Sequence, residues 1–200
     1  MLKIHFKVSI FGILMILVLI FGDNSKYAII ALSAAIIHEP GHIAASLLLK
    51  IKLDSFSLKL FKANIGVTLP LYSYKHELLL SLAGPIFNII SGIIAMYIYH
   101  RFYSNEYILF SIVASFFLAI LNLLPIKGFD GGRIFICALA PHFNIYIAEY
   151  ILEILSFSFI LLLWIVSIYL MLKIGSSLTL FVFSSALFAE MFLNSENFQK

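Results

Sequence analysis

The chain has 200 residues, of which 62% are hydrophobic and only 12% are charged, and its mean hydropathy is +1.07. A water-soluble domain of this size does not need so much apolar surface, so the composition excludes an ordinary soluble enzyme and indicates an integral membrane protein. The net charge of +3 gives no sign of a nucleic-acid partner, and the single cysteine, Cys137, excludes an internal disulfide.

Six apolar segments follow one another along the chain, with lengths near the ~20 residues that a helix needs to cross a bilayer. They run over approximately Ile4–Phe21, Tyr27–Leu49, Leu78–Tyr99, Tyr107–Leu124, Ile147–Leu172 and Leu178–Leu193. The first could be a signal peptide, but the residues after it lack a small-x-small cleavage pattern, which favours an uncleaved anchor. We therefore expect an all-α polytopic membrane protein with about six transmembrane helices in a single domain, residues 1–200.

The lysines and arginines predict the orientation of this bundle. With the N-terminus in the cytoplasm, ten of them lie in inner segments and only three, Lys26, Arg101 and Lys173, lie in outer loops. This is the positive-inside bias of multi-pass membrane proteins. Both termini are then cytoplasmic, and the inner half of the second helix shares a membrane face with the turn after the fourth.

The largest segment between the predicted helices is Lys50–Lys75. Two runs in it alternate apolar and polar residues around a turn at Asn64-Ile65-Gly66; the apolar positions are Phe56, Leu58 and Leu60, then Val67, Leu69 and Leu71. This pattern predicts a small membrane-associated β-hairpin between helices two and three. Its edge could receive an extended substrate segment as an added strand, or its lysines could simply meet anionic lipid.

The second apolar segment contains His38-Glu39-Pro40-Gly41-His42. Histidines four residues apart on a helix share one face, so both rings can reach one metal ion. A carboxylate is costly at this depth unless it has a function or a partner. Zinc in catalytic sites takes such ligands and keeps one position for water, whose proton a nearby carboxylate accepts. The motif therefore predicts His38 and His42 as ligands and Glu39 as the base.

Pro40 lies inside this motif. A proline there removes the backbone hydrogen bond to Ile36 and disfavours helical geometry at Glu39. The helix therefore either kinks, which would open the site to water, or unwinds; we favour the kink.

Asp130 is the best candidate for a third ligand. It follows the fourth apolar segment in Asn122-Leu123-Leu124-Pro125-Ile126-Lys127-Gly128-Phe129-Asp130-Gly131-Gly132, where Pro125 ends the helix and the glycines permit tight turns. An Asp-Gly-Gly alone indicates only a turn, and its pairing with the histidine motif makes it a candidate. Asn122 could bond a neighbouring helix, or steady the substrate or an oxyanion.

A third set of small and polar residues lies in the segment Leu78–Tyr99. Gly84, Asn88 and Gly92 are four residues apart and share one helix face, which indicates close helix packing, and Pro85 follows Gly84 directly.

Three motifs in this order resemble the site-2 family of intramembrane zinc metalloproteases: His38–His42, Ala83–Asn88, and Asn122, Pro125, Asp130 and Gly131. The resemblance implies one zinc ion per chain bound by His38, His42 and Asp130, with Glu39 activating water. It also implies that Asn122 and Asn88 assist near the scissile peptide and that Gly84, Pro85, Pro125 and Gly131 belong to structural motifs. The catalytic core is then about 27–133, with accessory helices at about 4–21 and 147–193.

The resemblance further implies hydrolysis of a peptide bond in or next to a transmembrane segment of a membrane-protein substrate, as in regulated intramembrane proteolysis of a transcription-factor precursor. The six-helix layout and inner-face site look like the bacterial branch that includes the sporulation protease acting on a sigma-factor precursor. This implies a bacterial cell membrane, a site near its cytoplasmic face, and regulatory membrane proteins as partners. Proteases of that kind usually carry a C-terminal nucleotide-sensing domain, and this sequence shows none.

Two other functions compete with the protease. A catalytically inactive scaffold that binds helices is favoured by Pro40, but such a scaffold has no use for the costly carboxylate of Glu39. A metal transporter would string acidic residues and histidines across several helices or show repeated halves, whereas here the polar residues converge near one face.

Overall fold

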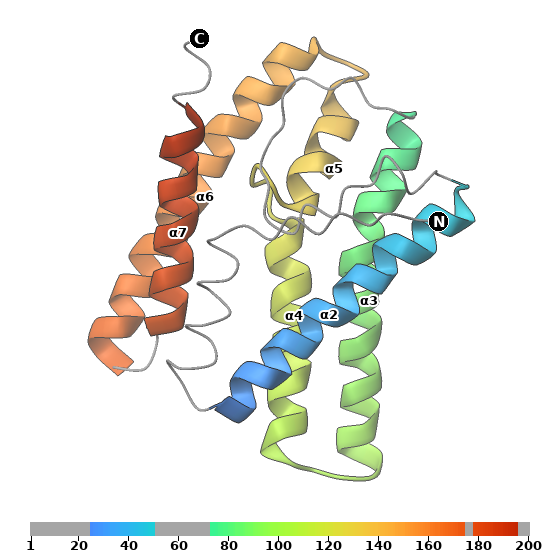
Figure 1. Ribbon diagram of the computed structural model, residues 1–200, viewed down its shortest axis with the longest axis vertical. Coiled ribbons are helices and arrows are strands. Elements are labelled where there is room, and N and C mark those ends of the chain that lie inside the picture. Colours follow the sequence, from blue (N-terminus) through green and yellow to red (C-terminus); the bar gives the residue numbers. More distant parts are fainter. Residues whose placement is uncertain (1–24, 51–72, 175–177, 196–200) are drawn as a thin grey trace, which may run out of the picture.

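The computed structural model of the chain describes residues 25–50, 73–174 and 178–195. These residues form six helices and contain no β-strand (Figure 1). The helices are α2 (Ser25–Leu48), α3 (Tyr74–Arg101), α4 (Glu106–Leu123), α5 (Asp130–Leu139), α6 (Ile145–Ile174) and α7 (Leu178–Ser195). The all-helical class is thus confirmed for the described part of the chain. Five helices match predicted segments to within a few residues, and α5 is the helix that the sequence analysis did not predict.

Two predicted elements fall outside the described residues. The first apolar segment, Ile4–Phe21, lies there entirely. The alternating runs of the predicted β-hairpin, from Phe56 to Leu71, lie there as well. Both stay predictions.

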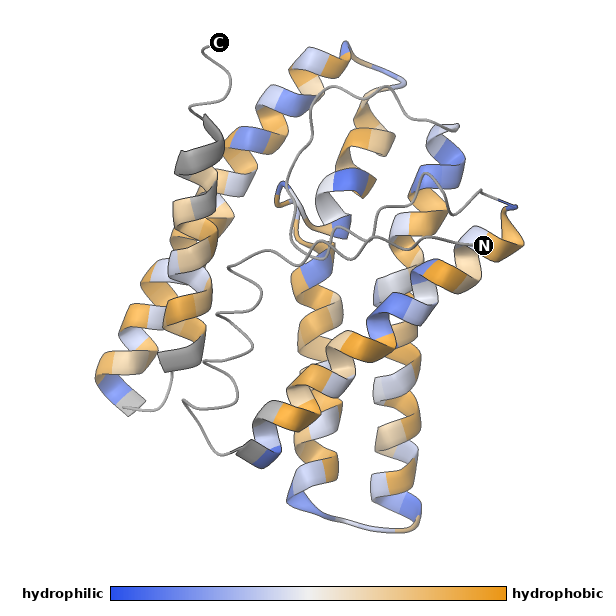
Figure 2. Cartoon of the chain, in the orientation of Figure 1, coloured by the Kyte–Doolittle hydropathy of each residue, from blue (hydrophilic) through white to orange (hydrophobic). Residues whose placement is uncertain are grey.

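Four of the described helices are long and apolar enough to cross a membrane. They are α2 over Ile29–Leu48, α3 over Tyr74–Arg101, α4 over Glu106–Leu123 and α6 over Ile145–Lys173. Helix α7 contains a shorter apolar stretch, Leu180–Ala189. Figure 2 shows hydrophobic residues over most of each long helix, with hydrophilic residues gathered at helix ends, around the start of α5 and within α2. Four helices could therefore span a membrane, which is consistent with a multi-pass membrane protein, while the count of six spans stays a prediction.

The helices form two groups joined through α5. Helices α3 and α4 lie side by side as an antiparallel pair, and α2 crosses both of them obliquely (Figure 1). Helices α6 and α7 form a second pair, and the ten-residue α5 packs against both α3 and α6. The end of α2, the beginning of α3, the end of α4 and the whole of α5 therefore meet at one end of the bundle.

The turn between α4 and α5 is set by its proline and its glycines. Leu124 is extended, with φ −62° and ψ 140°, because the following Pro125 disfavours helical geometry at this position. Gly128 has φ 98°, a left-handed conformation that favours glycine. Between them Ile126 is fully buried, and its carbonyl accepts a hydrogen bond from the Phe129 N–H at 3.0 Å. This tight turn ends at Asp130, the first residue of α5.

Candidate metal centre

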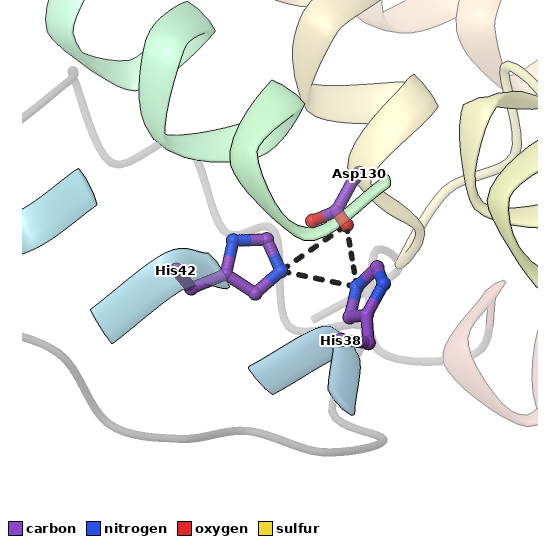
Figure 3. Close-up of side chains that lie close together, drawn as sticks. All are labelled: His38, His42 and Asp130. Carbon is purple, nitrogen blue, oxygen red and sulfur yellow. Dashed lines mark hydrogen bonds and ion pairs between the residues drawn. The ribbon is translucent and has the colours of Figure 1, made fainter. Parts of the chain in front are cut away.

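His38, His42 and Asp130 come together in one cluster (Figure 3). Nε2 of His38 lies 3.0 Å from Oδ2 of Asp130, Nε2 of His42 lies 3.3 Å from the same oxygen, and the two Nε2 atoms are 3.1 Å apart. Both histidines are 7% exposed, and the Asp130 side chain is 12% exposed. These are the three ligands that the sequence predicts, from α2 and from the first residue of α5, and the group could hold a metal ion.

The two histidines reach this cluster because α2 and α3 cross in very close contact. A Cβ atom added to Gly41 would lie 2.5 Å from the carbonyl oxygen of Ala83 and 3.0 Å from Cα of Gly84. Small residues permit such an approach of two helix backbones within a membrane. Gly41 lies between the two histidines in sequence, so the closest point of the crossing is also the site.

The spacing of the three ligand atoms fits a four-coordinate metal ion. Metal–ligand bonds of about 2.0–2.2 Å at tetrahedral angles would place two ligand atoms about 3.3–3.6 Å apart. The three distances here, 3.0, 3.1 and 3.3 Å, are slightly shorter, so a small outward shift of the side chains would accommodate the ion. A Cβ atom added to Gly84 would lie 2.5 Å from Nε2 of both histidines. Only a glycine at this position leaves the space in front of the two nitrogens free.

The position of the proton on the His42 ring also fits a metal ion between His42 and Asp130. Nδ1 of His42 lies 2.9 Å from the main-chain carbonyl oxygen of Leu80, which can only accept, so Nδ1 carries the proton of the neutral ring. Nε2 of His42 then presents a lone pair toward the carboxylate oxygen of Asp130. Two such acceptors repel each other unless a proton or a metal ion lies between them.

Asp130 is the first residue of α5, and Phe129 is the N-cap. The positive end of the helix dipole stabilises a carboxylate at this position. Burial raises the pKa of the Asp130 carboxyl, but the hydrogen bonds and charges of His38 and His42 outweigh burial, so its pKa lies below the ordinary value. The next residue, Gly131, must be a glycine for the chain to turn this tightly, since a Cβ atom on it would collide with the carbonyl oxygens of Leu123 and Leu124. The residues of this turn thus bring an ionised carboxylate to the two imidazoles.

Glu39 lies at the edge of the site. Its side chain is half-buried, and the charged groups that act on its carboxylate are His42, His38 and Asp130. Pro40, by contrast, is exposed on the opposite face of α2, and the helix is continuous through it from Ser25 to Leu48. The alternative of unwinding at Pro40 is therefore not observed, the favoured kink stays a prediction, and the proline ring does not displace the candidate ligands.

The remaining predicted residues have different surroundings. The side-chain nitrogen of Asn88 lies 3.1 Å from Nδ1 of His38, so this residue contacts a ligand directly. Nδ2 of Asn122 donates to the carbonyl of Leu118 at 3.1 Å, one turn back in its own helix, and no hydrogen bond joins it to the three ligands. Pro85 is fully buried within α3.

Sequence reasoning missed two contacts that support the candidate ligands, one made to His42 and one made to the turn before Asp130. One is the Leu80 carbonyl, which no sequence pattern reveals because any residue supplies it. The other is Ser156 of α6, whose Oγ accepts a hydrogen bond from the Lys127 N–H at 2.8 Å. Ser156 is 1% exposed. A serine in so apolar a helix is the one sign in the sequence that this residue could make a buried hydrogen bond.

Comparisons of the chain with models of protein families, with curated proteins and with solved structures find no match.

Proposed function

We propose that the chain is an intramembrane zinc metalloprotease of the site-2 type, which hydrolyses a peptide bond in or next to a transmembrane segment of a membrane-protein substrate. The observation that carries this proposal is the buried cluster of His38, His42 and Asp130 between helices that can span a membrane, with Glu39 beside it. Buried imidazoles and carboxylates in an apolar bundle need a partner, and one metal ion satisfies all three ligands.

Two nitrogen ligands and one oxygen ligand favour zinc, bound as one ion per chain by His38, His42 and Asp130. A zinc ion bound by three protein ligands acts as a Lewis acid and makes water nucleophilic near neutral pH. His38, His42 and Asp130 would hold this ion and would leave a coordination position for water, as three-ligand catalytic zinc sites do.

In this proposal Glu39 acts first as the general base and then as the general acid. Its carboxylate accepts a proton from the water that attacks the scissile carbonyl carbon. It then gives that proton to the nitrogen of the departing amine as the C–N bond breaks. Its position at the half-buried edge of α2 supports this role, because the group must meet both water and substrate. Asn122, at the end of α4, is proposed to assist near the scissile peptide.

The substrate must present its backbone in an extended form, since a helical carbonyl is already hydrogen-bonded. The site lies at the end of the bundle where α2 and α4 end, which is the cytoplasmic end in the orientation that the positive-inside bias predicts. We therefore propose cleavage near the cytoplasmic face of a bacterial cell membrane, with membrane proteins as substrates and as regulators.

The test combines zinc content with cleavage. Zinc per chain is measured in detergent by elemental analysis for the wild type, Glu39→Gln, Asp130→Ala and the control His76→Ala, and each is assayed against a panel of transmembrane substrates. His76 is exposed at the beginning of α3, outside the cluster. We expect about one zinc ion per chain in all but Asp130→Ala, and cleavage by the wild type and His76→Ala only.

A wild type without zinc, under conditions in which a control metalloprotease retains its own, would contradict the enzyme and favour a non-catalytic scaffold. Zinc in the wild type with equal cleavage by Glu39→Gln would leave the metal site but remove the role of Glu39.

A further inference from the structure

Asn88 lies directly behind the metal ligand His38. Its side chain is fully buried on α3, and Nδ2 is 3.1 Å from Nδ1 of His38. Its Oδ1 is the one buried side-chain oxygen or nitrogen without a hydrogen-bond partner in the part of the chain that the structure describes. A buried amide with one unpaired end costs free energy, so its orientation needs an explanation.

The orientation of this amide decides which nitrogen of His38 carries the proton. When the NH₂ group faces His38, it donates to Nδ1, and the neutral ring must carry its proton on Nε2. Nε2 then donates to Oδ2 of Asp130, 3.0 Å away, and has no lone pair for a metal. Rotating the amide by half a turn exchanges its oxygen and nitrogen with almost no change in shape.

We propose that in the metal-loaded protein Asn88 adopts this rotated orientation, in which Oδ1 accepts the Nδ1–H of His38 and leaves the Nε2 lone pair for the metal. Asn88 is then a positioning residue for a ligand. Each orientation leaves one end of the amide unpaired, so the proton on His38 decides between them. The inference rests on the metal site of the proposed function and not on peptide hydrolysis.

The other histidine supports this assignment. Nδ1 of His42 faces the Leu80 carbonyl, a pure acceptor, at 2.9 Å. With Asn88 rotated, both ligands on α2 donate Nδ1–H to an oxygen on α3, and both turn Nε2 toward Asp130. Metal-binding histidines are generally held in this way by an acceptor on the other ring nitrogen.

Two variants separate an accepting role from a donating or purely structural role. Asn88→Asp keeps the size and supplies only acceptors when ionised, whereas Asn88→Leu keeps the size and supplies neither donor nor acceptor. Zinc affinity of the full-length chain in detergent is measured by competition with a chromophoric chelator. Ser115→Ala, which removes a buried hydroxyl from α4, is the matched control.

We expect Asn88→Leu to bind zinc about 10–100-fold more weakly than the wild type, with Asn88→Asp and Ser115→Ala staying within about threefold. If Asn88→Asp loses as much affinity as Asn88→Leu, the acceptor role is wrong. If Asn88→Leu binds like the wild type, Asn88 has no role at the metal.

A measurement on the unmutated chain covers the case in which a variant fails to fold. In the zinc-loaded wild type labelled with ¹⁵N-histidine, with the His38 signals assigned from a His38→Gln sample, we expect a proton on Nδ1. An unprotonated Nδ1 would overturn the inference while leaving the metal site intact. A wild type that binds no zinc would instead contradict the metal site itself.

Discussion

The main-chain N–H of Lys127 donates a hydrogen bond to Oγ of Ser156, 2.8 Å away and 29 residues further along the chain. The same hydroxyl donates to the Leu152 carbonyl at 2.6 Å, so it is satisfied in both directions. Through this contact α6 holds the turn that carries Asp130, and a second contact, from Lys127 Nζ to Glu153 at 3.8 Å, lies beside it. Helix α6 thus supports the turn that carries Asp130 at the candidate metal centre.

We expect Ser156→Ala to destabilise the protein and weaken metal binding, because the part-buried Lys127 N–H loses the hydroxyl that accepts its hydrogen bond. Losing one such hydrogen bond costs about 1 kcal/mol, which corresponds to about 2–4 °C in the thermal midpoint of a chain of this size. Ser158→Ala is the control, because this exposed serine bonds only the Ile154 carbonyl in its own helix. Thermal unfolding in detergent with and without zinc gives both quantities, and equal midpoints for the two variants would contradict the role of Ser156.

The helices themselves were largely predictable from sequence. Apolar segments near the length of a bilayer span mark α2, α3, α4 and α6, since a polar residue there would be costly. Helix α5 was missed because its ten residues are too few to span a membrane and begin with Asp130-Gly131-Gly132, which indicates a turn.

The three candidate ligands were predictable from sequence, but the contacts that support them were not. His38 and His42 reveal themselves by helical spacing, and Asp130 by its place in a glycine-rich turn. The contact of Asn88 with His38 depends on how α2 crosses α3, and the contact of Ser156 with Lys127 depends on how α6 packs against the turn. Such contacts between distant segments leave no periodic signal in the sequence.

Gly84→Ala is expected to abolish metal binding while leaving the helices intact. The added methyl group would lie 2.5 Å from Nε2 of both His38 and His42, in the space where a shared metal ion must sit. Gly92→Ala is the matched control on the same helix, where the atoms nearest the methyl group belong to the ring of Phe116, the closest at 3.0 Å.

The measurement for this pair is zinc per chain together with helix content by circular dichroism. Near-stoichiometric zinc in Gly84→Ala would show that the metal does not occupy the space in front of the two histidines. Loss of zinc from Gly92→Ala as well would mean that packing of α3, and not the site, is responsible.

Pro40→Ala is expected to keep the zinc content of the wild type. The proline is exposed on the face of α2 opposite the two histidines, and the helix is continuous through it. Alanine restores the backbone N–H that proline lacks, so the helix should gain stability, by up to about 3 kcal/mol on the scale of helix propensities. Zinc analysis and thermal unfolding test this expectation, and a loss of zinc in Pro40→Ala would show that the proline shapes the site.

Cys137 is expected to be a slow nucleophile whose rate depends on Glu77. Burial raises the pKa of the Cys137 thiol to about 12, and the Glu77 carboxylate, with Oε2 3.8 Å from Sγ, adds to the increase, while Arg133 opposes it. Only the thiolate reacts, so a raised pKa lowers the rate at a fixed pH, and the rate should increase about tenfold per pH unit between pH 7 and 9. Because the chain has a single cysteine, alkylation with iodoacetamide followed by mass spectrometry reads this residue alone.

Glu77→Gln removes a negative charge next to the thiol and should speed alkylation several-fold, whereas Glu106→Gln, at the beginning of α4, should not. Equal rates for the two variants would mean that access to the buried sulfur, and not its charge environment, limits the reaction.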